Sequence, residues 1–154
     1  MSCLARSAGT LAMPNWRATT RQTLFDFLDT YKTANPTVLR QVHKTRPGSF
    51  RELPCAFIGE VGLTFLHAGQ VRQTGGAAEL VFVAGLADNT EAKDKLDAVV
   101  DAITEALTDD PHVLGANTVC EPMSISDDAI EQGGVVYTAV TLTVGRITIV
   151  EGRT

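Results

Sequence analysis

At 154 residues the chain has the length of one domain and can bury a hydrophobic core without metals or disulfides. Hydrophobic residues make up 44% of it and charged residues 20%, which excludes an intrinsically disordered chain. No apolar run approaches the roughly 20 residues that span a bilayer. The net charge of −5 and a pI near 5.1 argue against a nucleic-acid clamp, which would need clustered Lys and Arg.

The N-terminal segment, residues 1–14, holds one Arg and several small residues without a continuous apolar core. A secretory signal requires such a core, so we do not expect one here. We expect a flexible leader, with translation starting either at the first residue or at Met13.

The three cysteines, Cys3, Cys55 and Cys120, are far apart, odd in number and without C-x-x-C spacing. This pattern predicts neither a disulfide framework nor a redox motif, and it indicates a reducing compartment such as the cytoplasm. Cys55 lies in an apolar stretch, where we expect it to pack as a small hydrophobe.

The first predicted element is a helix over Trp16–Tyr31, which Asn15 can cap and which 34–36 (Ala-Asn-Pro) ends. A strand with modest alternation is predicted over Thr37–Thr45. A second strand runs over Pro54–Glu60. Pro is tolerated there because the first residue of a strand need not donate a ladder hydrogen bond.

The segment from Glu60 to Ala78 is polar and rich in glycine. An irregular stretch this long is uncommon in a compact domain and tends to be functional or disordered. We expect it to form an extended hairpin or arm. Its Phe65 and Leu66 would be exposed and would need a surface to pack on, such as a neighbouring subunit.

Residues 80–107 are the best-defined unit, a strand that leads directly into a helix. The strand, Leu80–Leu86, is apolar almost without a break, which predicts that both of its faces are covered. Asp88 is placed to cap the helix with Glu91 as its capping-box partner, and Glu91 and Lys95 form a favourable i,i+4 pair. The helix carries one apolar stripe, made of Ala92, Leu96, Val99, Val100, Ile103, Ala106 and Leu107.

The C-terminal third predicts two strands separated by an open polar loop. The first, Thr118–Glu121, is short because a proline follows it, and the loop leads to the glycine pair at 133–134. The last strand, Val135–Val144, alternates well. Its apolar phase then flips, which marks a bulge or a segment that leaves the sheet. We therefore expect residues 146–154 to form a C-terminal contact arm.

Motifs that carry chemistry are missing from the sequence. The three histidines lack metal-ligand spacing, and Asp109 and Asp110 beside His112 are typical of a turn after a helix. The acidic group at 127–131 lacks the register of a calcium loop. No phosphate-binding or nucleophile motif occurs. We predict no catalytic, cofactor-binding or metal-binding residues and no enzymatic activity.

The densest basic stretch runs from Arg40 to Arg51 and includes Lys44 and Arg46. Contact with phosphate is one interpretation of this stretch. We favour the other interpretation, a solvated strand end and loop, because such runs are common on protein surfaces.

Together these elements predict an α+β domain over residues 15–145. We expect a four- to five-stranded, largely antiparallel sheet with two helices packed on one face. The order of the elements and the amino-acid sequences at 88–89 and Leu96–Asp101 resemble those of the tail terminator, or tail completion, proteins of long-tailed bacteriophages. The resemblance covers roughly residues 15–145, nearly the whole chain, and rests on patterning and a few dipeptides, without a catalytic signature.

The resemblance implies a virion protein of the tail or neck, assembled in the host cytoplasm. It would form a homohexameric ring that caps the tail tube, ends its growth and offers a docking face to the head-completion or connector protein. DNA would pass through the ring without specific binding, and no cofactor or membrane is implied. The residues we expect at interfaces are Phe65, Leu66, His67, Arg40, Arg46, Arg51, Arg146, Ile147 and Ile149.

Two other interpretations stay open. A head–tail joining protein or another minor tail component would share the same order of elements. A small cytoplasmic ligand-binding or enzymatic domain would need a convergent polar pocket, and the sequence does not point to one.

Overall fold

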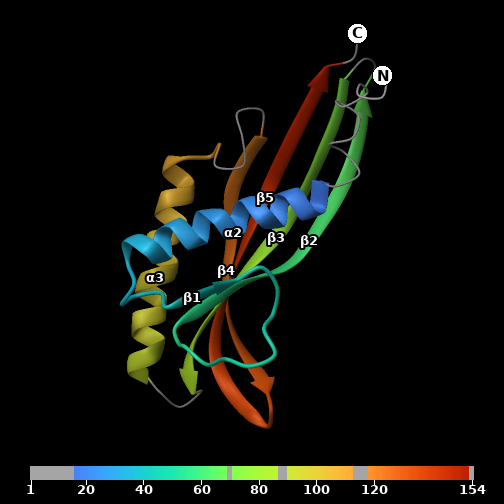
Figure 1. The fold of residues 1–154 in the computed structure, drawn as a ribbon. Helices are drawn as coiled ribbons and strands as arrows, with labels where there is room; N and C mark the ends of the chain where they lie inside the picture. The colour runs from blue at the N-terminus through green and yellow to red at the C-terminus, as the bar shows by residue number, and fades with distance from the viewer. Residues whose placement is uncertain (1–15, 69–70, 87–89, 113–117, 153–154) are drawn as a thin grey trace, which may run out of the picture.

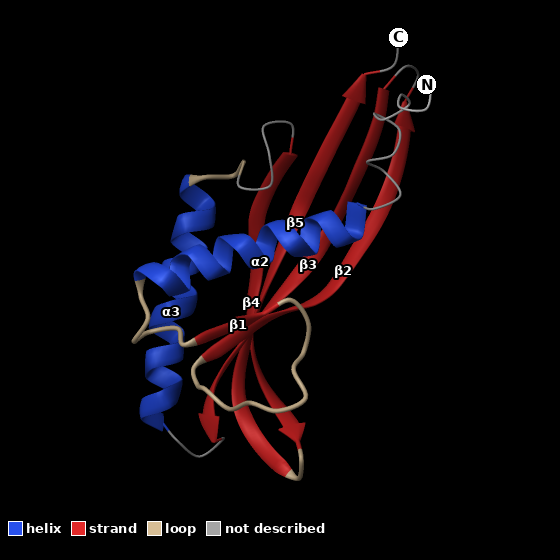
Figure 2. Cartoon of the chain, viewed as in Figure 1, coloured by secondary structure: helices blue, strands red, loops and turns tan. Residues whose placement is uncertain are grey.

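The computed structural model describes residues 16–68, 71–86, 90–112 and 118–152, which form two helices and one five-stranded sheet (Figures 1 and 2). The elements are α2 (Trp16–Ala34), β1 (Gln41–His43), β2 (Cys55–Ala68), β3 (Val71–Leu86), α3 (Thr90–Asp109), β4 (Thr118–Gln132) and β5 (Val135–Gly152). The strand order is β1-β2-β3-β5-β4, with β1 parallel to β2 and every other neighbouring pair antiparallel. The expected α+β fold with a largely antiparallel sheet is confirmed.

The first helix, α2, buries the apolar face that its sequence predicts. Leu24 and Leu28 are fully buried. The helix continues three residues past the expected end, to Ala34, and the backbone N–H of Asn35 then donates to the carbonyl of Tyr31 at 2.9 Å. This bond satisfies one of the carbonyl groups that a helix leaves without an intrahelical partner at its C-terminus.

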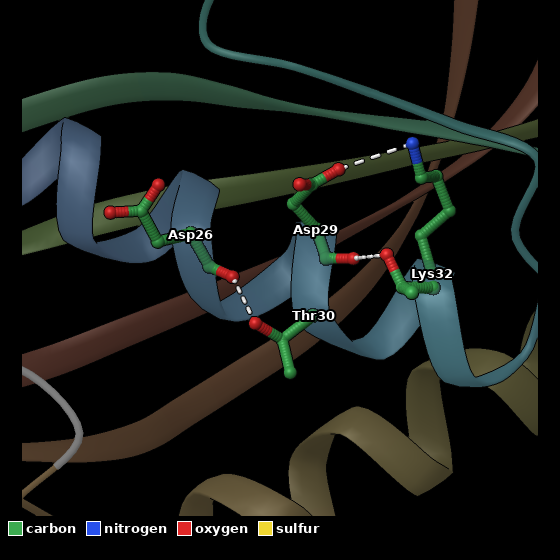
Figure 3. A network of polar contacts seen from close by, with 5 residues as sticks. Asp26, Asp29, Thr30 and Lys32 are labelled. Carbon is green, nitrogen blue, oxygen red and sulfur yellow. Dashed lines mark hydrogen bonds and ion pairs between the residues drawn. The ribbon is translucent and has the colours of Figure 1, made fainter.

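The outer surface of α2 is polar (Figure 3). The hydroxyl of Thr30 donates to the carbonyl of Asp26 at 2.9 Å, and Lys32 Nζ lies 3.1 Å from Asp29 Oδ1. Such contacts at three- and four-residue spacing add only a few tenths of a kcal/mol each at an exposed surface, so burial of the other face is what holds α2 in place.

The second helix, α3, also has its predicted apolar stripe. Five of its members lie at 0–2% exposure, and Ala92 and Ala106 are partly buried at its margins. The expected pair between Glu91 and Lys95 is present, with Lys95 Nζ 3.2 Å from Glu91 Oε1. The five buried residues are Leu96, Val99, Val100, Ile103 and Leu107. The expected helix caps, Asn15 and Asp88, lie outside the described residues.

Both faces of the sheet are covered where the two helices pack. On one face, Leu80 and Phe82 of β3 join a single core with α2 and α3, so the two helices share a face as expected. On the opposite face, Val81 and Val83 pack with Cys55, which is fully buried. The alternation along β3 confirms the prediction of a strand buried on both sides.

The second face is covered by the loop between β1 and β2, residues 44–54, which we call the covering loop. Phe50 of this loop stacks on Phe57 of β2, with ring centroids 6.3 Å apart, and meets Tyr137 of β5 edge-on at 5.0 Å. Aromatic pairs in these geometries contribute about 0.5–1.5 kcal/mol beyond the area they bury. The predicted strand at Thr37–Thr45 is reduced to Gln41–His43, because its flanks belong to turns and to this covering loop.

The glycine-rich segment from Glu60 to Ala78 forms the extended hairpin that we expected, but the expectation of little regular structure was wrong. β2 and β3 stay paired through it as far as Ala68↔Val71. β3 is also paired with β5 along the same stretch, down to Val71↔Gly152. Ladder bonds to β2 on one side and β5 on the other hold Gly75 and Gly76 extended, which the weak intrinsic preference of glycine for strands does not predict.

The expected short strand and open loop before β5 were also wrong. β4 continues from Thr118 through Pro122 to Gln132, and Gly133 and Gly134 make a two-residue turn into β5. Both glycines have positive φ, 62° and 81°, as a type I′ hairpin turn requires. Pro is tolerated within β4 because this strand lies at the edge of the sheet, where an outward N–H needs no partner.

The predicted break in phase after Val144 is a β-bulge. On β3, Gly76 and Ala78 pair with Ile147 and Val144 of β5, so two steps on one strand match three on the other. The β4 register skips in the same place. Of the two alternatives, bulge or departure from the sheet, the structure has the bulge, and β5 stays paired to Gly152.

The buried stripe of α3 predicts how neighbouring substitutions differ. Leu96→Asp places an unpaired charge in the core and should cost about 3–5 kcal/mol, enough to unfold a domain of ordinary stability. Asp97→Asn loses only a partly exposed contact with Lys93 at 3.5 Å and should cost less than about 1 kcal/mol. Thermal melting followed by circular dichroism measures both. Equal melting temperatures for the two variants would contradict the assigned helix face.

The turn between β4 and β5 gives a second prediction. Gly134→Val forces a branched side chain into the left-handed region and should destabilise the fold by about 1–2 kcal/mol in urea unfolding. Gly133→Asn is the matched control, since Asn tolerates positive φ and Asn-Gly is a favoured type I′ pair. A Gly134→Val protein as stable as wild type would argue against this turn.

Candidate functional site

The described residues that could bind a metal or act in catalysis do not lie together in the structure. Within the described ranges, no group of three or more His, Cys, Asp and Glu side chains is arranged to hold a metal ion. His43 lies in β1, His67 in β2 and His112 after α3, so the fold keeps the histidines on separate elements. The backbone N–H of His112 donates to Asp110 Oδ1 at 3.2 Å, which is the local turn contact that the sequence suggested.

The two described cysteines are unsuited to nucleophilic or redox chemistry. Cys55 and Cys120 are free and fully buried. Burial raises the pKa of the Cys55 thiol to about 12, and burial together with the charge of Glu121 raises the pKa of the Cys120 thiol to about 11. Reactive cysteines have lowered pKa values and access to solvent, so both thiols act as core atoms.

A surface pocket lies beside the junction of α2 and β2. Arg21, Gly59, Glu79 and Asp128 are among its lining residues. Arg21 Nη2 donates to the Gly59 carbonyl at 2.9 Å, while its buried Nε has no partner in the described structure. The lining combines the guanidinium of Arg21 with the carboxyl groups of Glu79 and Asp128. The pocket therefore favours neither an anionic nor a cationic ligand.

The structure brings together the two segments that the sequence singled out as contact arms. Phe65 of β2 is the register partner of Thr74 in β3, and Thr74 is the partner of Ile149 in β5. β3 therefore joins the expected hairpin and the expected C-terminal arm into one sheet. We call this part of the three strands the distal sheet, comprising 62–68 of β2, 71–77 of β3 and 146–152 of β5; the start of β4 also pairs with it, at Thr118↔Ile149 and Val119↔Thr148.

The distal sheet projects beyond the helices, and in Figure 1 its strands continue past the end of α2. It contains Phe65, Leu66, His67, Arg146, Ile147 and Ile149 from the expected interface. We expected Phe65 and Leu66 to be exposed; their side chains lie outside those that the structure describes. Its backbone register is nevertheless continuous across three strands.

The basic residues of the 40–51 stretch do not form one patch. Arg40 is exposed beside the start of β1, and Arg51 is exposed in the covering loop. Arg46 instead bonds across the sheet to β4, donating to Gln132 Oε1 at 2.8 Å and to the Glu131 carbonyl at 2.9 Å. Its charge-assisted bonds fix the covering loop, a structural role that local sequence did not reveal.

Sequence reasoning predicted only the first four residues of the edge strand β4, Thr118–Glu121, and missed its continuation to Gln132. β4 runs as a strand for 15 residues and exposes two large apolar side chains, Met123 at 60% and Ile125 at 48%. The glycine pair at 133–134 was the available signal, because two glycines between two strand-like segments are typical of a hairpin. The mostly polar sequence from Ser124 to Asp128 did not indicate a strand.

The comparisons with known proteins do not identify a family. No protein-family model matches the chain, and none of the curated proteins searched matches it. In the described part of the chain, no helix is both long and apolar enough to cross a membrane.

The buried thiols give a prediction about reactivity. At pH 8 a pKa of about 12 leaves on the order of one Cys55 thiol in ten thousand ionised, so native Cys55 and Cys120 should resist a thiol reagent until the domain unfolds. Reagent uptake by a Cys3→Ser protein, with and without denaturant, measures this. Rapid labelling of the native protein would show that these sites open far more readily than their burial indicates.

Proposed function

We propose that the chain is a structural protein of a long-tailed bacteriophage virion, a tail terminator. In this role it forms a homohexameric ring that caps the tail tube and ends its growth. The opposite face of the ring receives the head-side connector. The protein performs no chemistry, and its work is the geometric complementarity of its interfaces.

The observation that carries the proposal is the distal sheet. A sheet normally buries at least one face against another layer, and α2 and α3 pack against the other end of this one (Figure 1). Projecting strands of this kind suit contacts with neighbouring subunits or with the last ring of a tube. The segments that form the distal sheet are the two that sequence patterning marked as contact arms.

The remaining features favour assembly over catalysis. The described acidic and histidine residues do not gather into a metal site, and the two described thiols are buried with raised pKa values. The net charge of −5 suits a ring through which DNA passes without being held, since a binding protein would concentrate positive charge on the path of the phosphates.

A shortened hairpin tests the function. Gly62 and Ala77 are register partners, so replacing residues 63–76 with Asn-Gly should close β2 and β3 with a two-residue turn. The core lies outside the deleted part, and the variant should fold. We expect it to lose head-to-tail joining, measured as the fraction of complete particles seen by electron microscopy in a complementation assay.

Controls separate this outcome from misfolding and from other roles. The shortened protein should keep the wild-type circular dichroism spectrum, and Asp97→Asn should complement normally. Complete loss of the protein should yield tails of uncontrolled length, whereas tails of normal length that fail to join heads would favour a head–tail joining component. Mature virions without copies of the protein, by mass spectrometry, would overturn the structural role.

A further inference from the structure

Hydrogen bonds from elsewhere in the chain cover both ends of the outer edge of β4, and the part between them has no strand neighbour in the described structure. Within the described residues, β4 has one strand neighbour, β5. Near its start, the backbone N–H of Cys120 donates to the Pro111 carbonyl at 2.7 Å. Near its end, Arg46 donates to the Glu131 carbonyl. The stretch between these contacts presents a strand edge, and such edges are templates for pairing with another chain.

The open part of β4 combines apolar and acidic side chains. Met123 and Ile125 are exposed there, and Asp127 and Asp128 follow them. The whole strand has four acidic residues and no Lys or Arg, and one of the four, Asp127, already pairs with Lys93 of α3, whose Nζ lies 2.9 Å from Asp127 Oδ1. Pairing β4 with β4 of a second copy would bring like charges together, which is destabilising across strands. A two-fold contact through this edge is therefore disfavoured, and a basic partner edge is favoured.

The other side of the sheet offers such an edge in the same molecule. β1 covers β2 only as far as His43↔Phe57, and beyond this pair the strand neighbour of β2 is β3 alone in the described structure. There α2 approaches, and Arg17 Nε donates to the Val61 carbonyl at 2.9 Å, next to the Arg21 contact with Gly59.

The start of α2, which lies beside this second edge, carries charge opposite to that of β4, while Glu60 and Glu79 line the same pockets as its two arginines. The first ten residues of α2, Trp16–Phe25, contain Arg17 and Arg21 and no Asp or Glu. β2 itself has one acidic residue, Glu60. The part of β2 beyond the arginine contacts, Gly62–Ala68, is extended and has β3 as its strand partner on one side.

We infer that copies of this chain associate head to tail by strand addition, the open edge of β4 in one copy pairing with the 62–68 edge of β2 in the next. The incoming strand would lie beside Met123 and Ile125 and satisfy the open backbone groups of β4, and Asp128 would lie near Arg17 and Arg21 of the neighbouring copy. The two edges are different surfaces of one molecule, so the contact is heterologous and closes a ring when the rotation between copies allows. The inference deepens the proposed function and rests on it, since it names the two surfaces that join neighbouring subunits.

Cysteine cross-linking tests the pairing in the full-length protein. One protein carries Ser126→Cys on β4, and the other carries Leu63→Cys, Thr64→Cys or Phe65→Cys on β2, all in a Cys3→Ser background. Equal amounts of a β4 and a β2 variant are mixed at high concentration and low salt and then oxidised. We expect mixed disulfides above the share that random pairing gives, and a drop in high salt because the charges are screened.

A charge swap shows whether opposite charges guide the contact. Arg17→Glu in the β2 variant should reduce the mixed disulfide, and Asp128→Lys in the β4 variant should restore it. Thermal melting checks that each variant is folded, because Arg17 also bonds the Val61 carbonyl. A matched cysteine at Asp26, which is exposed on the outer surface of α2, serves as a control.

The outcomes separate this inference from the proposed function. Ser126→Cys homodimers in preference to mixed products would overturn head-to-tail pairing, and so would mixed products at only the random share. Specific mixed disulfides from a protein missing from virions would keep the interface and reject the tail role. Virion copies of a protein that forms no mixed disulfides would keep the tail role and reject this interface.

Discussion

The structure depends on β3, the strand that is paired along both of its edges. It forms ladders with β2 from Cys55↔Val83 to Ala68↔Val71 and with β5 from Leu86↔Tyr137 to Val71↔Gly152. The half of β3 that lies beside the helices is also buried on both faces, over Leu80–Ala84. One strand therefore carries the core and the distal sheet, and neither neighbour could hold its extended half without it.

The bulge in β5 lies where the two halves of the sheet meet. Before it, Val140, Leu142 and Val144 point into the helix-side core. At the bulge, Gly145 lies beneath Met123 of β4, and an added Cβ would overlap the Met123 sulfur. A side chain here would displace Met123 from the strand edge. Glycine thus leaves room for the Met123 side chain over β5 at the point where β5 shifts phase, and bulges commonly redirect a sheet.

The two edges of the sheet are protected to different degrees. α2 places guanidinium groups on β2 carbonyls, and the covering loop reaches β4 through Arg46. Natural sheets limit unwanted edge pairing with prolines, charges and covering elements, and β4 has Pro122 and an acidic run. The head-to-tail contact that we infer would use what remains open on β4 and would select a partner of opposite charge. That selectivity links the fold to the proposed ring, because subunits of a ring must recognise a surface different from their own.

Patterns with strong local periodicity were determined by the sequence alone. The stripe from Leu96 to Leu107 and the apolar run at Leu80–Leu86 predicted a buried helix face and a strand covered on both sides, because burial follows directly from side-chain spacing. The phase slip after Val144 predicted a bulge or a segment that leaves the sheet, since side chains in a strand alternate strictly, and the structure has the bulge.

Only the tertiary structure decided the state of the glycine-rich and polar segments. Glu60–Ala78 and Ser124–Gln132 have weak intrinsic preference for strands, and they are extended because ladder bonds to distant strands satisfy their backbone groups. The same holds for Arg46, whose partner Gln132 lies 86 residues away. The sequence by itself thus determined which faces are buried, while the edges, the distal sheet and the contacts between them depend on pairings that no local pattern encodes.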